Sequence, residues 1–259
     1  MPEGDTVWRA ARSLDRALAG HVLTGTTFRV PQLATADLSG ASLRRTISRG
    51  KHLLTHIDDG PQHWTLHTHL KMEGSWHIYQ HGQRWRRPAD EARVILETAD
   101  RVCVGFALGI VELFPRSEED QAVGHLGPDL LGDDWDLDEA VRRLSEQPQR
   151  PIGEALLDQR NLAGIGNIYR NEVCFLAGVR PTNPLSTVPN LPRLVARAKA
   201  MLEANKERVE QTTTGDLGKG RRSWVYRQRS CRRCGTTVVI AQDDRDRAMY
   251  WCPSCQPSA

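Results

Sequence analysis

Four cysteines near the C-terminal end constrain the fold of this chain more than any other feature. Cys231, Cys234, Cys252 and Cys255 follow the spacing C-x2-C-x17-C-x2-C. Such spacing places two pairs of thiolates on two turns of a small β-hairpin, the arrangement that a tetrahedral Zn²⁺ needs. We predict one structural zinc ion, because four thiolates close its shell and leave no position for a catalytic water. Two disulfides remain the alternative.

The other two cysteines are isolated from each other and from this motif. Cys103 and Cys174 lie in apolar sequence, which predicts buried free thiols. Reduced thiols, together with the lack of a basic-then-apolar leader, predict a cytoplasmic protein. No apolar run is long enough for a membrane helix, so we expect no membrane association.

The C-terminal segment is basic, whereas the rest of the chain is not. Residues 215–259 contain nine basic and four acidic side chains, a net charge of +5, although the whole chain carries only +3. Everything before residue 215 therefore has a net charge of −2. A compact basic end indicates a polyanionic partner, and a merely solvated surface is the alternative.

The first half of the chain reads as one helix followed by short strands. Apolar residues at helical spacing predict a helix directly behind the N-terminus, with Asp5 as its N-cap and Gly20 as its stop. From His21 to about Phe114, brief alternating runs broken by Gly, Asp and Pro predict strands. A two-layer β-sandwich is the natural packing of such strands.

The second half is helical and ends in the cysteine hairpin. We expect helices over residues 136–144, 152–158, 168–177 and 191–211. A chain of 259 residues is long enough for two or more domains. The domains that we predict are residues 1–118, 119–214 and 215–259.

The N-terminus carries a candidate nucleophile. Removal of Met1 would leave Pro2 as a secondary amine with the carboxyl group of Glu3 beside it. An α-amino group has a reference pKa near ~8, against ~10.4 for lysine, so it is more often unprotonated at neutral pH. A secondary amine condenses with an aldehydic C1′ to give a cationic iminium that acidifies the C2′ protons. Glu3 could then protonate a ring oxygen or a departing group. The alternative is that Met1-Pro2 reflects only ordinary N-terminal processing, without a catalytic role for Pro2.

A glycine-containing turn between two predicted helices is a candidate anion clamp. Gly164 and Gly166 allow a tight turn that presents backbone N–H groups, and Asn167 can cap the next helix or donate to a phosphate. A plain connection between helices, with glycine at a C-cap, is the alternative.

Taken together, four separated motifs resemble the formamidopyrimidine-DNA glycosylase and endonuclease VIII family. They are the N-terminal Pro2-Glu3-Gly4, the Arg49-Gly50-Lys51 turn, the helix-two-turns-helix segment around Asn167, and the four-cysteine finger. The resemblance covers nearly the whole chain. It implies an α+β multidomain fold: an N-terminal β-sandwich with a leading helix, then a helix-two-turns-helix domain with a zinc-finger β-hairpin.

The resemblance also implies roles for individual residues. Pro2 matches the nucleophile that attacks C1′ of a damaged nucleotide, and Glu3 matches the catalytic acid. Lys51 matches the lysine that contacts the lesion phosphates and assists β-elimination, and Arg247 matches the finger arginine linked to δ-elimination. The implied DNA-contacting residues are Asn167, Gly166, Lys71, Met72 and His125, with Met72 at the position of the side chain that fills the void left by the flipped nucleotide.

Within the family, the chain looks more like endonuclease VIII, and most like the second endonuclease VIII paralogue of actinobacteria. The guanine-oxidation branch typically carries an Arg-Arg-Phe-Gly wedge, whereas residues 104–112 here read Val-Gly-Phe-Ala-Leu-Gly-Ile-Val-Glu. Oxidised pyrimidines are therefore the expected bases. Three departures from the family pattern put efficiency and substrate range in doubt: Thr6 replaces a second glutamate, Glu73 an aromatic residue, and His125 an arginine.

The sequence thus predicts a bifunctional DNA glycosylase and AP lyase that acts through a Schiff base on Pro2, followed by β,δ-elimination. The expected partner is damaged DNA in duplex, bubble or single-stranded form, and the protein is expected to be a monomer without an organic cofactor. The alternative is a DNA-binding protein of the same fold with vestigial catalysis that senses abasic sites or single strands. A zinc-ribbon factor would leave Pro2, Glu3 and Lys51 unexplained.

Overall fold

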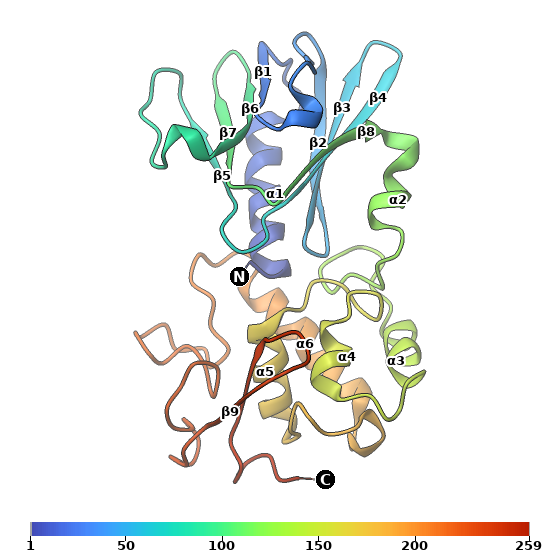
Figure 1. Ribbon diagram of the computed structural model, residues 1–259, viewed down its shortest axis with the longest axis vertical. Helices are drawn as coiled ribbons and strands as arrows, with labels where there is room; N and C mark the ends of the chain where they lie inside the picture. The colour runs from blue at the N-terminus through green and yellow to red at the C-terminus, as the bar shows by residue number, and fades with distance from the viewer. Residues whose placement is uncertain (1, 259) are drawn as a thin grey trace. The chain divides into compact units, whose positions relative to one another are not determined.

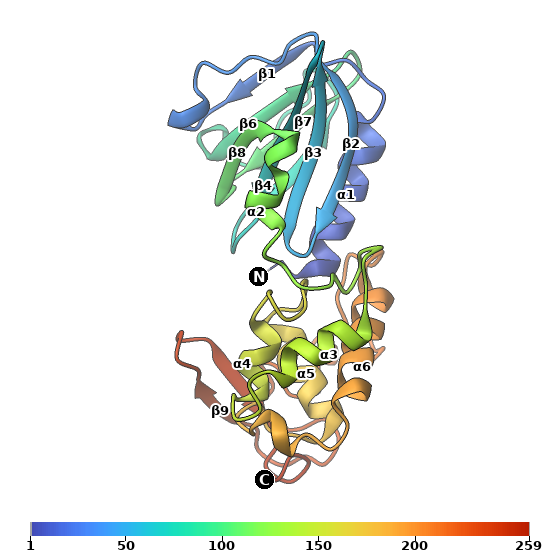
Figure 2. The same ribbon diagram turned by 90° about the vertical axis from the view of Figure 1, so that its right-hand side faces the viewer.

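The computed structural model describes residues 2–258, which form two compact units. The first unit contains Pro2 and residues 6–125, and the second contains residues 3–5 and 126–258. Figure 1 and Figure 2 show the β-rich unit with α1, and the helical unit with the β9 strand. The division into three domains at residues 118 and 214 stays a prediction.

Two antiparallel four-stranded sheets and one long helix make up the first unit. The first sheet has the order β1 (Gly25–Phe28), β6 (Ala92–Glu97), β7 (Val102–Phe106) and β5 (Ser75–Tyr79). The second sheet has the order β2 (Ser42–Arg49), β3 (His52–Asp59), β4 (Gln62–His69) and β8 (Ile110–Pro115). The helix α1 spans Gly4–Leu18, and short 3-10 turns lie at Pro31–Leu33, Ala89–Glu91 and Arg116–Glu118. The predicted β-sandwich with a leading helix is confirmed.

The core of this unit lies where both sheets and α1 contribute apolar side chains. Each strand alternates between its two faces, so that Leu53 and Ile57 of β3 point to the side shared with Leu96 of β6. The helix α1 buries one stripe, because Val7, Leu14 and their helical neighbours recur every three or four residues. The buried core residues include Val7, Ala11, Leu14, Leu18, Leu43, Leu53, Ile57, Leu66, Val94, Leu96 and Cys103.

The opposite face of the second sheet is polar and rich in histidine. His52 and His56 lie on this face of β3, beside Thr65, His67 and His69 of β4. The five-residue helix α2 (Glu119–Val123) follows β8, and Glu119 accepts hydrogen bonds from this face. Its carboxylate lies 2.8 Å from His56 Nε2 and 2.7 Å from Thr65 Oγ1. Sequence periodicity gave no sign of α2, because five residues are too few to show a helical repeat.

The second unit combines four helices with the finger hairpin. Its helices are α3 (Leu137–Ser145), α4 (Ile152–Leu157), α5 (Asn167–Ala177) and α6 (Leu191–Asn205), with a 3-10 turn at Leu185–Thr187. The finger strands β9 (Val239–Gln242) and β10 (Ala248–Trp251) pair antiparallel. The helix α6 ends at Asn205, six residues before the expected end. The Asn205 amide donates to the carbonyls of Met201 and Thr212, which turns the chain out of the helix.

A buried carboxylate attaches the segment before the finger to α5. Glu172 accepts hydrogen bonds from the backbone N–H groups of Trp224, Val225 and Tyr226 at 2.7 to 2.9 Å, and from the Thr213 hydroxyl. Burial raises the pKa of the Glu172 carboxyl, and these donated hydrogen bonds act in the opposite direction. The finger therefore has a fixed attachment to the helical core besides any metal.

Two tight turns place the lysines of the predicted site. Gly50 has a φ of 59° and precedes Lys51 in the two-residue turn that joins Arg49 to its cross-strand partner His52. A positive φ at the first turn position suits glycine and matches a type II′ hairpin. Lys71 itself has a φ of 50°, in the turn between β4 and β5. Among the described residues, no helix is long and apolar enough to cross a membrane.

Candidate active site

Glu3 caps the N-terminus of α5 from a distant part of the sequence. The Glu3 side chain is 1% exposed, and its carboxylate accepts hydrogen bonds from the N–H groups of Gly166 at 2.8 Å and Ile168 at 2.7 Å. The N–H of Tyr169 contributes a longer bond of 3.4 Å. These donors belong to the first turn of a helix, whose N–H groups have no partner within the helix. The helix dipole also favours a negative charge at this end.

Glycines make this close approach possible. A Cβ atom on Gly166 would lie 2.5 Å from Cδ of Glu3, and one on Gly4 would lie 2.9 Å from Cα of Gly164. The Gly4 N–H donates to the Gly164 carbonyl at 2.8 Å, so residues 3–5 run against the turn before α5. The N–H of Gly166, which we expected to present to a phosphate, thus donates to Glu3. The N-cap position of α5 belongs to Gly166 rather than Asn167.

Asp5 has a different role from the predicted helix cap. It lies inside the first turn of α1, and its carboxylate accepts the Tyr169 hydroxyl at 2.8 Å and the Gln211 amide at 3.0 Å. Burial, followed by the charge of Asp5, raises the pKa of Tyr169. Tyr169 is therefore a neutral donor that helps to hold the N-terminal segment against α5.

Asn167 and Arg247 meet in one polar network between α5 and the finger. The Asn167 amide donates to the Ala248 carbonyl at 3.0 Å and accepts from Arg170. Arg170 is fully buried and donates to Asp243 at 2.6 Å, and Asp243 also accepts Nε of Arg247 at 2.9 Å. Removal of one partner from a buried pair leaves an uncompensated charge, which typically costs about 3 to 5 kcal/mol. The network therefore fixes the finger hairpin as well as Asn167, a predicted DNA-contacting residue, and Arg247, a predicted catalytic residue.

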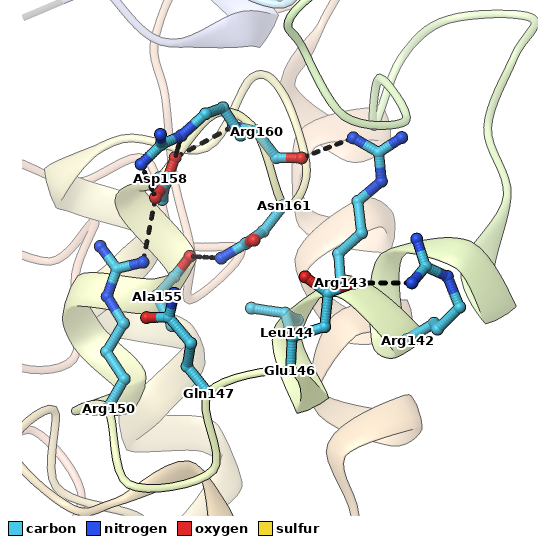
Figure 3. Close-up of a pocket in the computed structure, with 10 residues that line it drawn as sticks. All are labelled: Arg142, Arg143, Leu144, Glu146, Gln147, Arg150, Ala155, Asp158, Arg160 and Asn161. Carbon is cyan, nitrogen blue, oxygen red and sulfur yellow. Dashed lines mark hydrogen bonds and ion pairs between the residues drawn. The ribbon is translucent and has the colours of Figure 1, made fainter.

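Arg247 borders a cavity of about 310 Å³ between α4 and the finger. Its walls carry charges of both signs, and its lining consists of Arg150, Glu154, Leu157, Asp158, Gln159, Asp244, Arg245 and Arg247. Figure 3 shows a second cavity of about 330 Å³ that also reaches Arg150 and Asp158. There, both Arg150 and Arg160 bind Asp158, while Arg143 donates to the Arg160 carbonyl at 2.8 Å. These contacts brace the loop that leads into the turn before α5.

The lysine turns of the first unit carry the remaining predicted residues. Lys51 and Lys71 both act electrostatically on His69, whose pKa is lowered to about 4 by burial and then by these charges. Met72 projects from its turn with 64% of its surface exposed. His125 is exposed, and its ring lies edge-on to His52 at 6.4 Å between centroids. The structure therefore gathers Lys51, Lys71 and His125 at one edge of the second sheet.

The turn between β7 and β8 holds no wedge. Ala107 adopts a φ of 46°, and Leu108 is buried in the core. A Cβ on Gly109 would lie 2.2 Å from Cγ of Lys71, so the lysine stem packs over this glycine. Residues 107–109 consequently present no large exposed side chain.

The four finger cysteines fit a tetrahedral metal. Their sulfur atoms all lie within 4.8 Å of one another, with separations of 3.4 Å for Cys234–Cys252 and 4.0 Å for Cys231–Cys255. Zn–S bonds of about 2.3 Å imply S···S distances of about 3.8 Å, whereas a disulfide needs about 2.05 Å. The disulfide alternative is therefore wrong. Cys103 and Cys174 are buried free thiols as predicted, and burial raises the pKa of each to about 12.

Comparisons with known proteins agree with this geometry. Residues 1–107 match the formamidopyrimidine-DNA glycosylase N-terminal domain, and residues 126–215 match the formamidopyrimidine-DNA glycosylase H2TH domain. The chain is 52% identical over 99% of its length to the probable endonuclease 8 2 of Streptomyces coelicolor, and covers 94% of that protein. It is 47% identical to the DNA-(apurinic or apyrimidinic site) lyase Nei2 of Mycolicibacterium smegmatis, with full coverage of both chains.

A solved structure shares the fold at lower identity. Lactococcus lactis Fpg (MutM), in complex with DNA that contains N7-benzyl-Fapy-dG, superposes with a TM-score of 0.81 at 22% identity. The comparison covers 99% of this chain and all of that one. The chain therefore belongs to the formamidopyrimidine-DNA glycosylase and endonuclease VIII family, and its relatives at about half identity are second endonuclease VIII paralogues.

Replacement of Gly166 by Ala tests the placement of Glu3. The new methyl group would displace the Glu3 carboxylate, and a shift of about 1 Å at a reacting group can reduce a rate by about a hundredfold. We expect strand cleavage at abasic DNA to fall by at least about tenfold. The matched control is Gly153→Ala, which clashes with Pro181 at 2.8 Å in the same unit. Both variants should lose stability in thermal melts, so equal cleavage rates in the two would contradict the role of this contact.

Proposed function

We propose that this protein is a bifunctional DNA glycosylase and AP lyase of base-excision repair, which removes oxidised bases through a Schiff base on Pro2. The observation that carries the proposal is the fixed position of Glu3. A carboxylate held by helix N–H groups directly follows the only residue of the chain that can offer a secondary amine after Met1 is removed. The named activity of the relatives supports the same conclusion.

The two residues act in turn. The Pro2 lone pair forms the N–C1′ bond while the base departs, and the attached nitrogen then loses its proton. The nitrogen lone pair next breaks the C1′–O4′ bond, which opens the sugar ring and yields the cationic iminium. Glu3 accepts hydrogen bonds in the structure, so it is set to receive that proton first and to donate it afterwards to the ring oxygen or the departing base. Loss of a C2′ proton then breaks the C3′–O bond, which is β-elimination. A second, δ-elimination breaks the C5′–O bond and leaves a 3′-phosphate on the other fragment.

Lys51 and Arg247 supply the phosphate contacts and the assistance to elimination. Lys51 stands at the tip of a hairpin turn, from which an ammonium group can reach a phosphate, and Arg247 offers a planar guanidinium beside a cavity. Gly166 is the N-cap of α5 and Asn167 is its first residue, and their place beside Glu3 and the finger supports a role in positioning DNA. Lys71 and His125 flank the same sheet edge as Lys51.

Oxidised pyrimidines are the preferred bases in this proposal. Met72 is exposed enough to enter a base stack, whereas the turn at residues 107–109 offers nothing to support it. Extrusion of a nucleotide costs a few kcal/mol and is cheapest for a damaged or unpaired base. Duplex, bubble and single-stranded DNA are all substrates here, and the enzyme acts as a monomer in the compartment that holds the DNA.

The finger holds one zinc ion through Cys231, Cys234, Cys252 and Cys255, and the ion's part is structural. Four thiolates complete its shell, so the chemistry stays with the protein's own groups.

Replacement of Pro2 by Gly is expected to lower base excision and strand cleavage, because a primary amine is a poorer route to a stable iminium. Retention of Met1 should abolish both, since no amine is then available at residue 2. DNA binding should stay within a few fold in both proteins. Gel assays with abasic duplex, with and without borohydride, measure strand cleavage and DNA binding, and a duplex that contains an oxidised pyrimidine measures base excision. Full lyase activity with Met1 retained would transfer the role to a lysine, and binding without any trapping by the wild type would favour a sensor of damage.

Removal of the metal is expected to abolish DNA binding before the β-sandwich unfolds. Small metal-pinned hairpins take most of their folding free energy from the ion, whereas the first unit has its own core. Chelator titration with parallel binding and circular-dichroism measurements tests this, with Cys234→Ser as the matched variant and Cys103→Ser as a control outside the finger. Normal affinity of the metal-free protein for abasic duplex would show that the finger does not contact DNA.

The base preference is expected to favour 5-hydroxyuracil over 8-oxoguanine paired with cytosine. A well-stacked base pair costs more free energy to open when no side chain fills the void left by the flipped nucleotide. An oxidised pyrimidine or a bubble costs less, because its stacking is already weaker. Single-turnover excision from matched duplex and bubble oligonucleotides measures the difference. Faster excision of 8-oxoguanine from intact duplex than of 5-hydroxyuracil from either context would overturn the preference and leave the reaction class intact.

A further inference from the structure

A chain of hydrogen bonds crosses the histidine-rich face of the second sheet. Nδ1 of His52 lies 2.8 Å from Nε2 of His67, and Nδ1 of His67 lies 2.8 Å from a carboxylate oxygen of Glu112. The three residues come from β3, β4 and β8, which are neighbours in the sheet. The middle of the chain is enclosed and Glu112 reaches solvent: the His67 side chain is 3% exposed, that of Glu112 is 54% exposed, and His52 is half-buried.

The bonding pattern fixes where the protons are. The ionised carboxylate of Glu112 can only accept, so Nδ1 of His67 carries a proton. In a neutral His67 ring Nε2 is then an acceptor, and the hydrogen bond requires that Nδ1 of His52 donates to it. His52 consequently keeps a bare Nε2. The neighbouring ring has the opposite arrangement, since Nδ1 of His69 accepts the Lys71 N–H at 2.9 Å.

The surroundings of His52 keep it uncharged. Its pKa is lowered to about 3, mainly by burial and then by the nearby rings of His69, His67 and His125 and the ammonium of Lys71. His52 directly follows Lys51, and its ring lies edge-on to His69 at 4.9 Å. A ring that cannot hold a positive charge can still pass a proton on, provided that the charge is neutralised at the other end.

We propose that His52, His67 and Glu112 form a proton relay that carries a proton from the Lys51 edge of the sheet to solvent during the elimination steps. The inference rests on the proposed function, because the lyase reaction must dispose of the protons that are lost from C2′ of the sugar. His67 and Glu112 act through His52 and are positioning residues. They do not contact DNA in this proposal.

Each transfer in the relay is balanced. Nε2 of His52 accepts a proton from the site, and its Nδ1 proton moves to Nε2 of His67. The Nδ1 proton of His67 moves to the Glu112 carboxylate, which then releases a proton to solvent. Both rings end neutral with the proton on the other nitrogen, so no positive charge remains beside Lys51 and Lys71. Reverse transfer or ring rotation restores the starting arrangement before the next turnover.

The same sheet face offers a matched control. His56 and Glu119 form an equivalent histidine–carboxylate pair at 2.8 Å. Arg45 donates to His56 and Thr65 donates to Glu119, so this pair does not extend to His52 through these bonds. The exposed position of Glu112 makes Glu112→Gln compatible with folding, whereas a change at buried His67 would disturb the core. The comparison of Glu112→Gln with Glu119→Gln therefore separates the relay from a merely structural role.

The test is single-turnover cleavage of a duplex with a pre-formed abasic site, from pH 5.5 to 9. We expect Glu112→Gln to slow elimination by roughly tenfold to a hundredfold, the scale of one assisted proton transfer. Its Kd should stay within about twofold of the wild type, and its yield of borohydride-trapped complex should be unchanged. Added imidazole buffer should restore part of the rate in a concentration-dependent way, as should Glu112→Asp. Glu119→Gln should match the wild type.

Equal rates and pH profiles for Glu112→Gln and Glu119→Gln would overturn the relay, as would a slow Glu112→Gln that no buffer rescues. Failure of the wild type to form a trapped complex would instead overturn the proposed function. The two failures are therefore distinguishable in one set of assays.

Discussion

The contact between Glu3 and the first turn of α5 is the constraint on which the rest of the site depends. Hydrogen bonds to a charged group contribute about 1.5 to 3 kcal/mol each, and Glu3 accepts two short ones and a longer third. The same contact fixes residue 2 to within one peptide unit, because Pro2 and Glu3 share a bond of the chain. A flexible N-terminus would otherwise spread its amine over many positions. In the proposed mechanism, the interaction thus gives the N-terminal nucleophile a defined position.

Buried charged side chains likewise hold the finger against the helical core. Arg170 and Asp243 lie fully enclosed, and Asp243 also holds Arg247. Glu172 holds the chain before the first finger cysteine through three consecutive backbone N–H groups. Such networks are sensitive to the loss of one partner. The finger is therefore expected to behave as a rigid part of the helical unit once its metal is bound, and not as a tethered module.

Local patterns could predict much of this structure. The cysteine spacing predicted the metal hairpin, and periodicity predicted the sandwich and the four helices of the second unit, because those signals lie within a few residues of one another. The capping of α5 by Glu3 joins residues about 165 positions apart, and no local pattern reports such a contact. Asp5 likewise looked like a helix cap because its partner Tyr169 is equally remote.

The histidine-rich face also depends on contacts between residues that are far apart in the sequence. The short run Leu53-Leu54 between His52 and His56 is compatible with a strand, but it does not indicate which strands lie beside it. Only the sheet order β3-β4-β8 brings His67 between His52 and Glu112. The alternation of faces along each strand explains why each of these side chains lies on the histidine-rich face. The register between the strands explains why the three side chains form a continuous series of hydrogen bonds.

The most direct test of the account is to identify the atom that becomes linked to DNA. Borohydride reduction of the protein on abasic duplex, followed by nuclease and trypsin digestion and mass spectrometry, locates the adduct. The account predicts a sugar-derived mass on the peptide of residues 2–9, which begins with Pro2 and ends at Arg9. An adduct on residues 50–71, where a modified Lys51 would block cleavage, or on a peptide that still carries Met1, would contradict it.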